Sequence, residues 1–106
     1  MLIWLKKEYF LQMKEGIKKL EVRVAYNSLK NLKPGHAITF QCGQERINVR
    51  IKNIRRYSTF ALMLEKEDFR LIAKNKTKQE ILKIFQAIYP LNKETLGVLV
   101  FEIELI

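Results

Sequence analysis

The sequence is poor in the residues that build metal sites and disulfide bonds. It contains one cysteine, Cys42, and one histidine, His36. A single cysteine excludes an internal disulfide and a cysteine-based zinc site, so we expect neither a metal ion nor another cofactor. Cys42 lies in an apolar run and is interpreted as a small buried residue. The sequence identifies no partner for His36, which is therefore not assigned as a general base.

Long apolar segments and chain breakers are also scarce. No segment approaches the roughly 20 apolar residues of a membrane-spanning helix, and residues 1–10 lack the apolar core of a signal peptide. We therefore expect a cytoplasmic protein without a membrane partner. With four glycines, two prolines and 48% hydrophobic residues among 106, the composition favours a single domain over residues 1–106 and excludes a disordered chain.

Negative charge is in the minority. The chain has 20 Lys and Arg residues against 11 Asp and Glu residues, which gives a formal net charge of +9. An excess of this size attracts polyanions and accelerates their encounter with the protein. By charge alone the candidate partners are RNA, DNA, acidic proteins and anionic membrane surfaces, and the alternative is a Lys-rich surface that only maintains solubility. The basic composition favours a nucleic acid or a nucleotide.

The apolar residues follow a pattern of short strands. Strands are expected at residues 2–5, 20–24, 37–42, 46–57 and 97–106. The apolar positions of the fourth segment change phase after Ile51, which predicts a bulge near Lys52 and Asn53. Most connections are too short for parallel crossovers, so we expect an α+β fold: a small, mainly antiparallel β-barrel with flanking helices over its openings.

Helices are expected between the strands, over residues 5–16, 26–32, 58–65 and 77–89. Ser58 is the expected N-cap of the third helix, and Thr77 with Glu80 forms a capping box for the last one. The large aromatic residues of these segments are expected in the core: Trp4, Phe10, Phe60 and Phe85.

The run from Gly16 to Arg23 has the highest density of candidate functional residues. Period-two alternation places Lys19, Glu21 and Arg23 on one face of a strand, with Lys18 at its start. Glu21 can pair with Arg23 and hold the guanidinium as a planar donor for a phosphate or a base edge. The alternative is a solvated strand face whose ion pair contributes less than ~1 kcal/mol. The pattern alone does not decide between the two.

Tyrosines and basic residues elsewhere offer further candidates. Tyr26, Tyr57 and Tyr89 end predicted elements beside polar or basic residues, where a phenol ring can stack on a base or cover the core with its hydroxyl in water. Tyr57 and Tyr89 are kept as candidates, and Tyr26 is interpreted as a core cover. Basic residues along the fourth strand suit a phosphate backbone or a charged exterior: Arg46, Arg50, Lys52, Arg55 and Arg56.

The pattern G-x-K-x-x-E-x-R, filled by Gly16, Lys18, Glu21 and Arg23, resembles the signature of ASCH domains, relatives of the PUA RNA-binding fold. The resemblance continues in the expected order at residues 33–35, 56–60, 88–90 and 97–98. It implies a PUA-like β-barrel with flanking helices and a cleft lined by the Lys-Glu-Arg strand. It also implies RNA-related functions. His36 departs from the family pattern, which commonly has an acidic residue at this position.

The resemblance first implies a binding module for RNA, a nucleoside or a nucleotide. Lys18 and Arg23 then engage phosphate or base, Glu21 orients Arg23 or accepts from a base amine, and Tyr57 or Tyr89 stacks. The full set of candidate binding residues is Lys18, Lys19, Glu21, Arg23, Arg56, Tyr57, Ser58 and Tyr89. Apart from the resemblance, a protein-interaction domain in a transcription or translation complex is a weaker alternative.

The second implication is an enzyme. Some small bacterial ASCH proteins are amidohydrolases that release acetate from N4-acetylcytidine with a Lys, a Thr and a Glu. Lys18 matches that lysine, but Glu21 stands where the threonine belongs and residues 74–76 hold no glutamate. Other relatives are ribonucleases, for which Lys18, Tyr57 and Ser58 are suitable residue types. If the protein is an enzyme, Lys18 and Glu21 are its candidate catalytic residues, and the sequence leaves this open.

Overall fold

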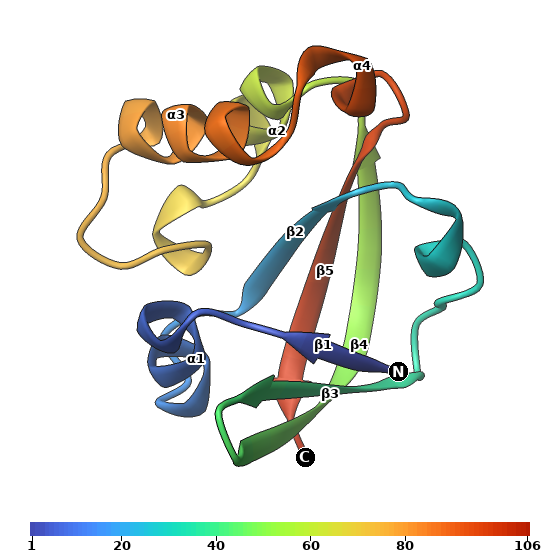
Figure 1. Ribbon diagram of the computed structural model, residues 1–106, viewed down its shortest axis with the longest axis vertical. Coiled ribbons are helices and arrows are strands. Elements are labelled where there is room, and N and C mark those ends of the chain that lie inside the picture. Colours follow the sequence, from blue (N-terminus) through green and yellow to red (C-terminus); the bar gives the residue numbers. More distant parts are fainter.

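Five strands form one strongly curved sheet. The computed structural model describes residues 1–106, and its strands are β1 (Leu2–Trp4), β2 (Leu20–Val24), β3 (Ala37–Cys42), β4 (Glu45–Tyr57) and β5 (Val98–Leu105). Their order in the sheet is β1-β3-β4-β5-β2. Only the β1–β3 pair is parallel. The sheet curls into a half-barrel that is open between β1 and β2 (Figure 1). The α+β class and the mainly antiparallel pairing are confirmed.

Strand β4 contains the predicted bulge. Its register with β5 shifts between Ile51 and Asn53, which confirms the expectation from the change of apolar phase. The extra residue lets Ile54 pack against the same cluster of side chains as Val49 and Ile51. Because the alternation is reset, Tyr57 packs against the other cluster. The bulge therefore determines which side chains at the end of β4 point toward each core cluster.

Helices cover the ends and one side of the sheet. They are α1 (Lys7–Lys14), α2 (Phe60–Lys66), α3 (Lys78–Ile88) and α4 (Leu91–Glu94), with short 3-10 helices η1 (Asn27–Leu29) and η2 (Phe69–Leu71). Helices α2, α3 and α4 lie at one end of the long strands β4 and β5 (Figure 1). The helix expected over residues 26–32 is only the single turn η1. No helix has the length and apolar character needed to cross a membrane.

Capping explains two of the helix boundaries. Thr77 Oγ1 accepts from the Glu80 amide at 3.1 Å, and Glu80 Oε1 accepts from the Thr77 amide at 2.9 Å, so the predicted capping box is confirmed. The N-cap of α2 is Thr59, whose hydroxyl accepts from the Leu62 amide at 3.0 Å, and the prediction of Ser58 was wrong by one residue. Both residue types can cap a helix, so the sequence did not fix the boundary.

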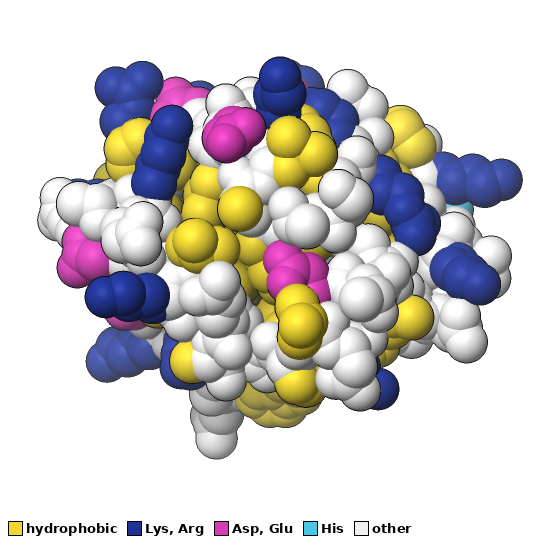
Figure 2. Space-filling view, turned by 90° about the horizontal axis from the view of Figure 1, so that it is seen from above, with side chains coloured by type: hydrophobic (Ala, Val, Ile, Leu, Met, Phe, Trp, Pro, Cys, Tyr) yellow, Lys and Arg dark blue, Asp and Glu magenta, His cyan; other side chains and the backbone are white.

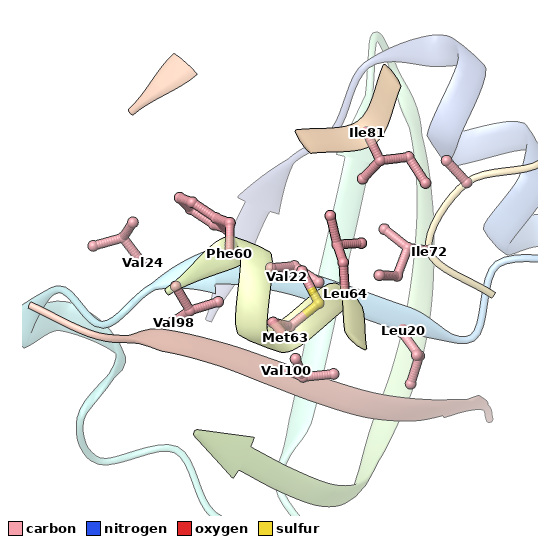
Figure 3. Packing of buried hydrophobic residues seen from close by; sticks show 11 residues of the cluster. Leu20, Val22, Val24, Phe60, Met63, Leu64, Ile72, Ile81, Val98 and Val100 are labelled. Carbon is pink, nitrogen blue, oxygen red and sulfur yellow. The ribbon is translucent and has the colours of Figure 1, made fainter. Parts of the chain in front are cut away.

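The core consists of two clusters on the two faces of the sheet. Strand β5 alternates between them: Val98 and Val100 belong to the first, and Leu99 and Phe101 to the second. In the first cluster, side chains of α2 pack onto β2 and β5 (Figure 3). The aromatic residues expected in the core are mostly found there, since Phe10 and Phe60 are buried and Phe85 packs against the first cluster.

Trp4 contradicts the expectation of a core residue. Its side chain is 63% exposed. In the short strand β1 only Ile3 packs against the core, while Leu2 and Trp4 point to the opposite side. The sequence Leu2–Leu5 is apolar throughout, so alternation gave no indication of which residues face inward.

Candidate functional site

A cavity of about 210 Å³ opens beside the gap between β1 and β2. Helix α3 supplies apolar walls through Ile81, Ile84, Phe85 and Ile88, and the segment after η2 adds Ile72 and Ala73. The segment between β1 and α1, together with Tyr9 of α1, lines the opposite side. Three charged groups converge where Lys18, Glu21 and Arg23 of the β2 strand region enter the cavity, and Lys6 is the fourth charged residue of its lining. An apolar pocket with a few convergent polar groups is the usual form of a small-molecule site.

The turn before β2 brings Lys18 into this position. Gly16 has a φ of +79°, a left-handed conformation that glycine adopts readily and that ends α1. The amides of Ile17 and Lys18 then both donate to the Gln12 carbonyl, at 2.9 and 3.0 Å. The chain reverses sharply, and the Lys18 side chain enters the interior. The glycine of the sequence pattern therefore serves the placement of the lysine.

Lys18 is buried, with only 4% of its side chain exposed. Its Nζ donates to the Leu20 carbonyl at 2.6 Å and to the Ile72 carbonyl at 2.9 Å, and lies 3.1 Å from Glu21 Oε1. Since an ammonium group has three N–H donors, these three acceptors occupy all of them. Burial lowers the pKa of Lys18, and the charge and hydrogen bond of Glu21 act in the opposite direction.

Glu21 lies between two cations. Its Oε1 faces Lys18, and its Oε2 accepts from Arg23 Nε at 2.6 Å. Only 6% of the Glu21 side chain is exposed. The expected pairing of Glu21 with Arg23 is therefore present, but the solvated face that was its alternative is not. A buried carboxylate needs such partners, because an unpaired charge in the interior is strongly destabilising.

Arg23 joins the two open edges of the sheet. Besides its contact with Glu21, its Nη2 donates to the Trp4 carbonyl of β1 at 3.4 Å. A guanidinium carries five N–H donors, so most of them make no hydrogen bond within the protein. The Arg23 side chain is 26% exposed. The three charged groups together carry one net positive charge, and all three residues line the cavity.

Tyr89 closes one end of the cavity with an aromatic ring. It stacks on Phe60 with ring centroids 5.6 Å apart, and Phe60 stacks on Phe85 at 4.8 Å. The ring centroids of Tyr26 and Tyr89 lie 6.3 Å apart. Burial raises the pKa of the Tyr89 hydroxyl, while the positive charge of Arg23 acts to lower it. Tyr89 is thus close to the charged cluster, as well as being part of the aromatic packing.

The structure brings together four of the eight predicted site residues and separates the rest. Lys18, Glu21, Arg23 and Tyr89 line the cavity, whereas Lys19, Arg56, Tyr57 and Ser58 do not. Lys19 and Ser58 are exposed. Arg56 donates to the Leu96 carbonyl at 2.7 Å.

Tyr57 belongs to a second group of charges at the far end of α2. Its hydroxyl donates to Glu67, which also accepts from Arg55 at 2.6 and 2.8 Å. Arg55 further donates to Glu102 at 2.7 Å. The pKa of Glu67 is lowered, chiefly by the hydrogen bond from Arg55. These contacts tie the end of α2 to β4 and β5.

Sequence reasoning missed several cavity residues. Trp4 and Phe85 were assigned to the core, and Tyr9, within the helix expected over residues 5–16, was not assigned to a site. Tyr9 lies four residues after Leu5, and both line the cavity; the Lys18 ammonium lies 5.9 Å from the Tyr9 ring centroid. Helical spacing showed which residues share a face, but not that the face borders a cavity. The structure groups no three His, Cys, Asp or Glu side chains in a way that could hold a metal ion.

Comparison with known proteins identifies the family to which this fold belongs. The family model of the ASCH domain matches residues 3–106. The chain therefore belongs to the ASCH domain family, whose general roles are RNA-binding or hydrolase-like. The resemblance read from the sequence is thus confirmed.

Two solved structures are similar over nearly the whole chain. Hypothetical protein PH0355 has a crystal structure with a TM-score of 0.89 and 36% identity, covering 99% of this chain and 97% of that one. The solution structure of protein PF0455 from Pyrococcus furiosus gives a TM-score of 0.81 and 33% identity, covering 99% and 96%. These similarities confirm the PUA-like ASCH fold.

A more distant protein shares the fold alone. Protein EF3133 from Enterococcus faecalis V583 is 12% identical, with a TM-score of 0.63 over 91% of this chain and 68% of that one. No curated protein matches the chain in sequence.

Proposed function

We propose that the protein binds a pyrimidine nucleotide of single-stranded RNA, with the base in the cavity between β2, α1 and α3. The observation that carries this proposal is the cluster of the buried Lys18 and Glu21 with the partly exposed Arg23, which forms a polar end of a mostly apolar cavity. Such a cavity favours a flat, weakly hydrated ring, and its polar end favours a ring with both donors and acceptors on one edge.

The size of the cavity suits a six-membered ring. An apolar cavity of about 150 Å³ is large enough to hold benzene. The cavity here measures about 210 Å³, which leaves room for the exocyclic groups of a pyrimidine. A purine has a second fused ring and would leave less of this space for its exocyclic groups. The volume therefore favours cytosine or uracil over adenine or guanine.

The polar end of the cavity complements the edge of a pyrimidine. Each Glu21 oxygen accepts one bond within the protein, and a carboxylate oxygen has a second lone pair. Glu21 can thus accept from a base N–H, and the free N–H donors of Arg23 can reach a neighbouring ring nitrogen or carbonyl. Lys18 has no donor to spare, so its role is to hold Glu21 in place.

The charge of the protein supports a polyanionic ligand. The net charge is +9. On the face formed by α2, α3 and α4, hydrophobic side chains gather at the centre and most Lys and Arg side chains stand toward the edge (Figure 2). Apolar surface suits the bases of a single strand and surrounding cations suit its phosphates, so this distribution supports the proposal.

Titration calorimetry with cytidine, uridine and adenosine 5′-monophosphates at low salt tests the proposal. We expect a pyrimidine nucleotide to bind more tightly than the purine. Arg23→Gln should weaken that binding about 10- to 150-fold, as expected for loss of a charge-assisted hydrogen bond in a desolvated site. The matched control is Arg50→Gln, an exposed arginine of β4, which should change the affinity less than about twofold. Equal losses in both variants, or no binding by the wild type, would contradict the proposal.

One observation favours a hydrolase as the second candidate. Burial lowers the pKa of Lys18, which is the direction that a lysine general base requires. However, all three donors of Lys18 are engaged, and Glu21 occupies the position of the family's threonine. We therefore expect N4-acetylcytidine to be hydrolysed far more slowly than by a dedicated amidase. The hydrolysis can be followed by the change in the ultraviolet absorbance of N4-acetylcytidine. Rapid turnover that depends on Lys18 would establish an amidohydrolase instead.

A further inference from the structure

Trp4 is a large aromatic side chain in an unusual place. It is the only tryptophan of the chain, it is 63% exposed, and it lines the cavity at the gap between β1 and β2. A tryptophan buries more apolar surface than any other side chain when it is packed. An exposed one at the rim of a pocket therefore leaves surface that a ligand can cover.

The backbone around Trp4 is fixed on two sides. The Leu5 amide donates to the Gln41 carbonyl of β3 at 2.9 Å, and the Trp4 carbonyl accepts from Arg23 Nη2 at 3.4 Å. The indole is thus presented by a strand of the sheet, and Arg23 links the backbone of Trp4 to the Glu21 carboxylate. A side chain held in this way loses little backbone entropy when a ligand stacks on it.

The indole has no aromatic or cationic partner within the protein. None of the ring pairs involves Trp4, and none of the cation–π contacts does. Two cations, Lys6 and Arg23, line the cavity beside it. An unpartnered ring with cations in the same cavity is an arrangement on which single-stranded nucleic acids stack, since the ring takes a base and the charges take phosphates.

We propose that Trp4 is a stacking platform for the base next to the one in the cavity, so that the protein prefers a single strand to an isolated nucleotide. This inference rests on the proposed function. Stacking is tolerant of base identity, so the cavity would select one base and Trp4 would add affinity for any neighbour. The cations beside the ring and the net charge of +9 favour RNA over a protein partner on this surface.

The test uses cytidine 5′-monophosphate and a cytidylate hexamer as probes. The hexamer should quench the fluorescence of Trp4, which is the only indole in the protein. In anisotropy measurements with a labelled hexamer, Trp4→Ala should weaken binding about 5- to 150-fold, the usual range for loss of one stacked base. The indole also borders the cavity, so the affinity of this variant for the mononucleotide can fall as well, but it should fall clearly less than its affinity for the hexamer. Trp4→Phe should retain part of the hexamer affinity.

Leu2→Ala is the matched control, because Leu2 lies on the same side of β1, is 44% exposed and does not line the cavity. It should leave both affinities unchanged. If both probes bind and Trp4→Ala leaves the hexamer affinity intact, the inference is wrong while the proposed function stands. A parallel loss of both affinities would make Trp4 a wall of the cavity and would also overturn the inference. If neither probe binds the wild type, the proposed function fails as well.

A protein partner on this surface has a different signature. If sedimentation velocity shows that the wild type self-associates and that Trp4→Ala is monomeric, while hexamer binding is unchanged, the indole belongs to a protein interface and the stacking role is refuted. If the protein sediments as the same species with and without the substitution while hexamer binding falls, the stacking role is supported.

Discussion

Replacing Lys18 should destabilise the fold, because the structure buries it among acceptors. Lys18→Met retains the length and most of the volume of the side chain but removes the charge and its three contacts, to Leu20, Ile72 and Glu21. The Glu21 carboxylate, 6% exposed, is then left with Arg23 as its only cation. Removing one partner of a buried ion pair typically costs about 3–5 kcal/mol.

This loss is large for a chain of 106 residues. Domains of this kind have a total stability of about 5–15 kcal/mol, and 1 kcal/mol corresponds to roughly 4–8 °C in Tm. Lys18→Met should therefore lower Tm by more than ~12 °C, measured by circular dichroism. The effect arises from the fold alone and should be present without any ligand.

The matched control is Lys19→Met, one residue along the chain, where the side chain is exposed. It should change the free energy of unfolding by less than about 0.5 kcal/mol. The double variant Lys18→Met/Glu21→Gln should lose less stability than the sum of the losses in the two single variants. In the double variant, no buried carboxylate is left without its lysine partner. If Lys18→Met loses less than ~1 kcal/mol, the account of a buried, saturated ammonium is wrong.

Three further predictions concern the rest of the molecule. The pKa of Glu67 is lowered from its ordinary value of 4.5, so the ionised carboxylate stabilises the fold above pH 4.5, and this stabilisation is lost as the pH falls through the lowered pKa. Glu67→Gln should therefore reduce the difference between the unfolding free energies measured in urea at pH 7 and at pH 3.5. An unchanged difference would refute this. Phe60→Ala removes a fully buried ring and should cost about 3–5 kcal/mol in chemical denaturation, whereas a loss below ~1 kcal/mol would mean that the core closes around the gap. The affinity for single-stranded RNA should fall with salt at a log–log slope of roughly −0.7 per phosphate contacted, and a flat salt dependence would exclude phosphate contacts.

The sequence predicted the positions of most elements, but not what covers them. The alternation in residues 20–24 correctly indicated β2 and its inner residues, which pack in the first core cluster. It could not show that the other face of β2 is also covered. Lys18 is enclosed there partly by the Ile72 carbonyl, which lies 54 residues later in the chain. Period-two alternation identifies residues that share a face and carries no information on distant segments that pack against it.

Tertiary packing also explains why only one of the two candidate tyrosines, Tyr57 and Tyr89, lines the cavity. Tyr57 and Tyr89 have comparable local sequences, since each ends an element beside polar residues. Only Tyr89 lies at the cavity, whereas the bulge at residues 51–53 directs Tyr57 toward Glu67. A bulge can be predicted from a change of phase, as it was here. The partner that the redirected side chain meets depends on the tertiary fold.

The most direct test of the central claim is the position of a bound pyrimidine. In an NMR measurement of the complex with cytidine 5′-monophosphate, the claim predicts intermolecular NOEs from the H5 and H6 protons of cytosine to the methyl groups of Ile72, Ile81 and Ile84, which line the cavity. Cross-peaks only to side chains of the exposed face of β4, such as Arg50, would place the base outside the cavity and contradict the claim.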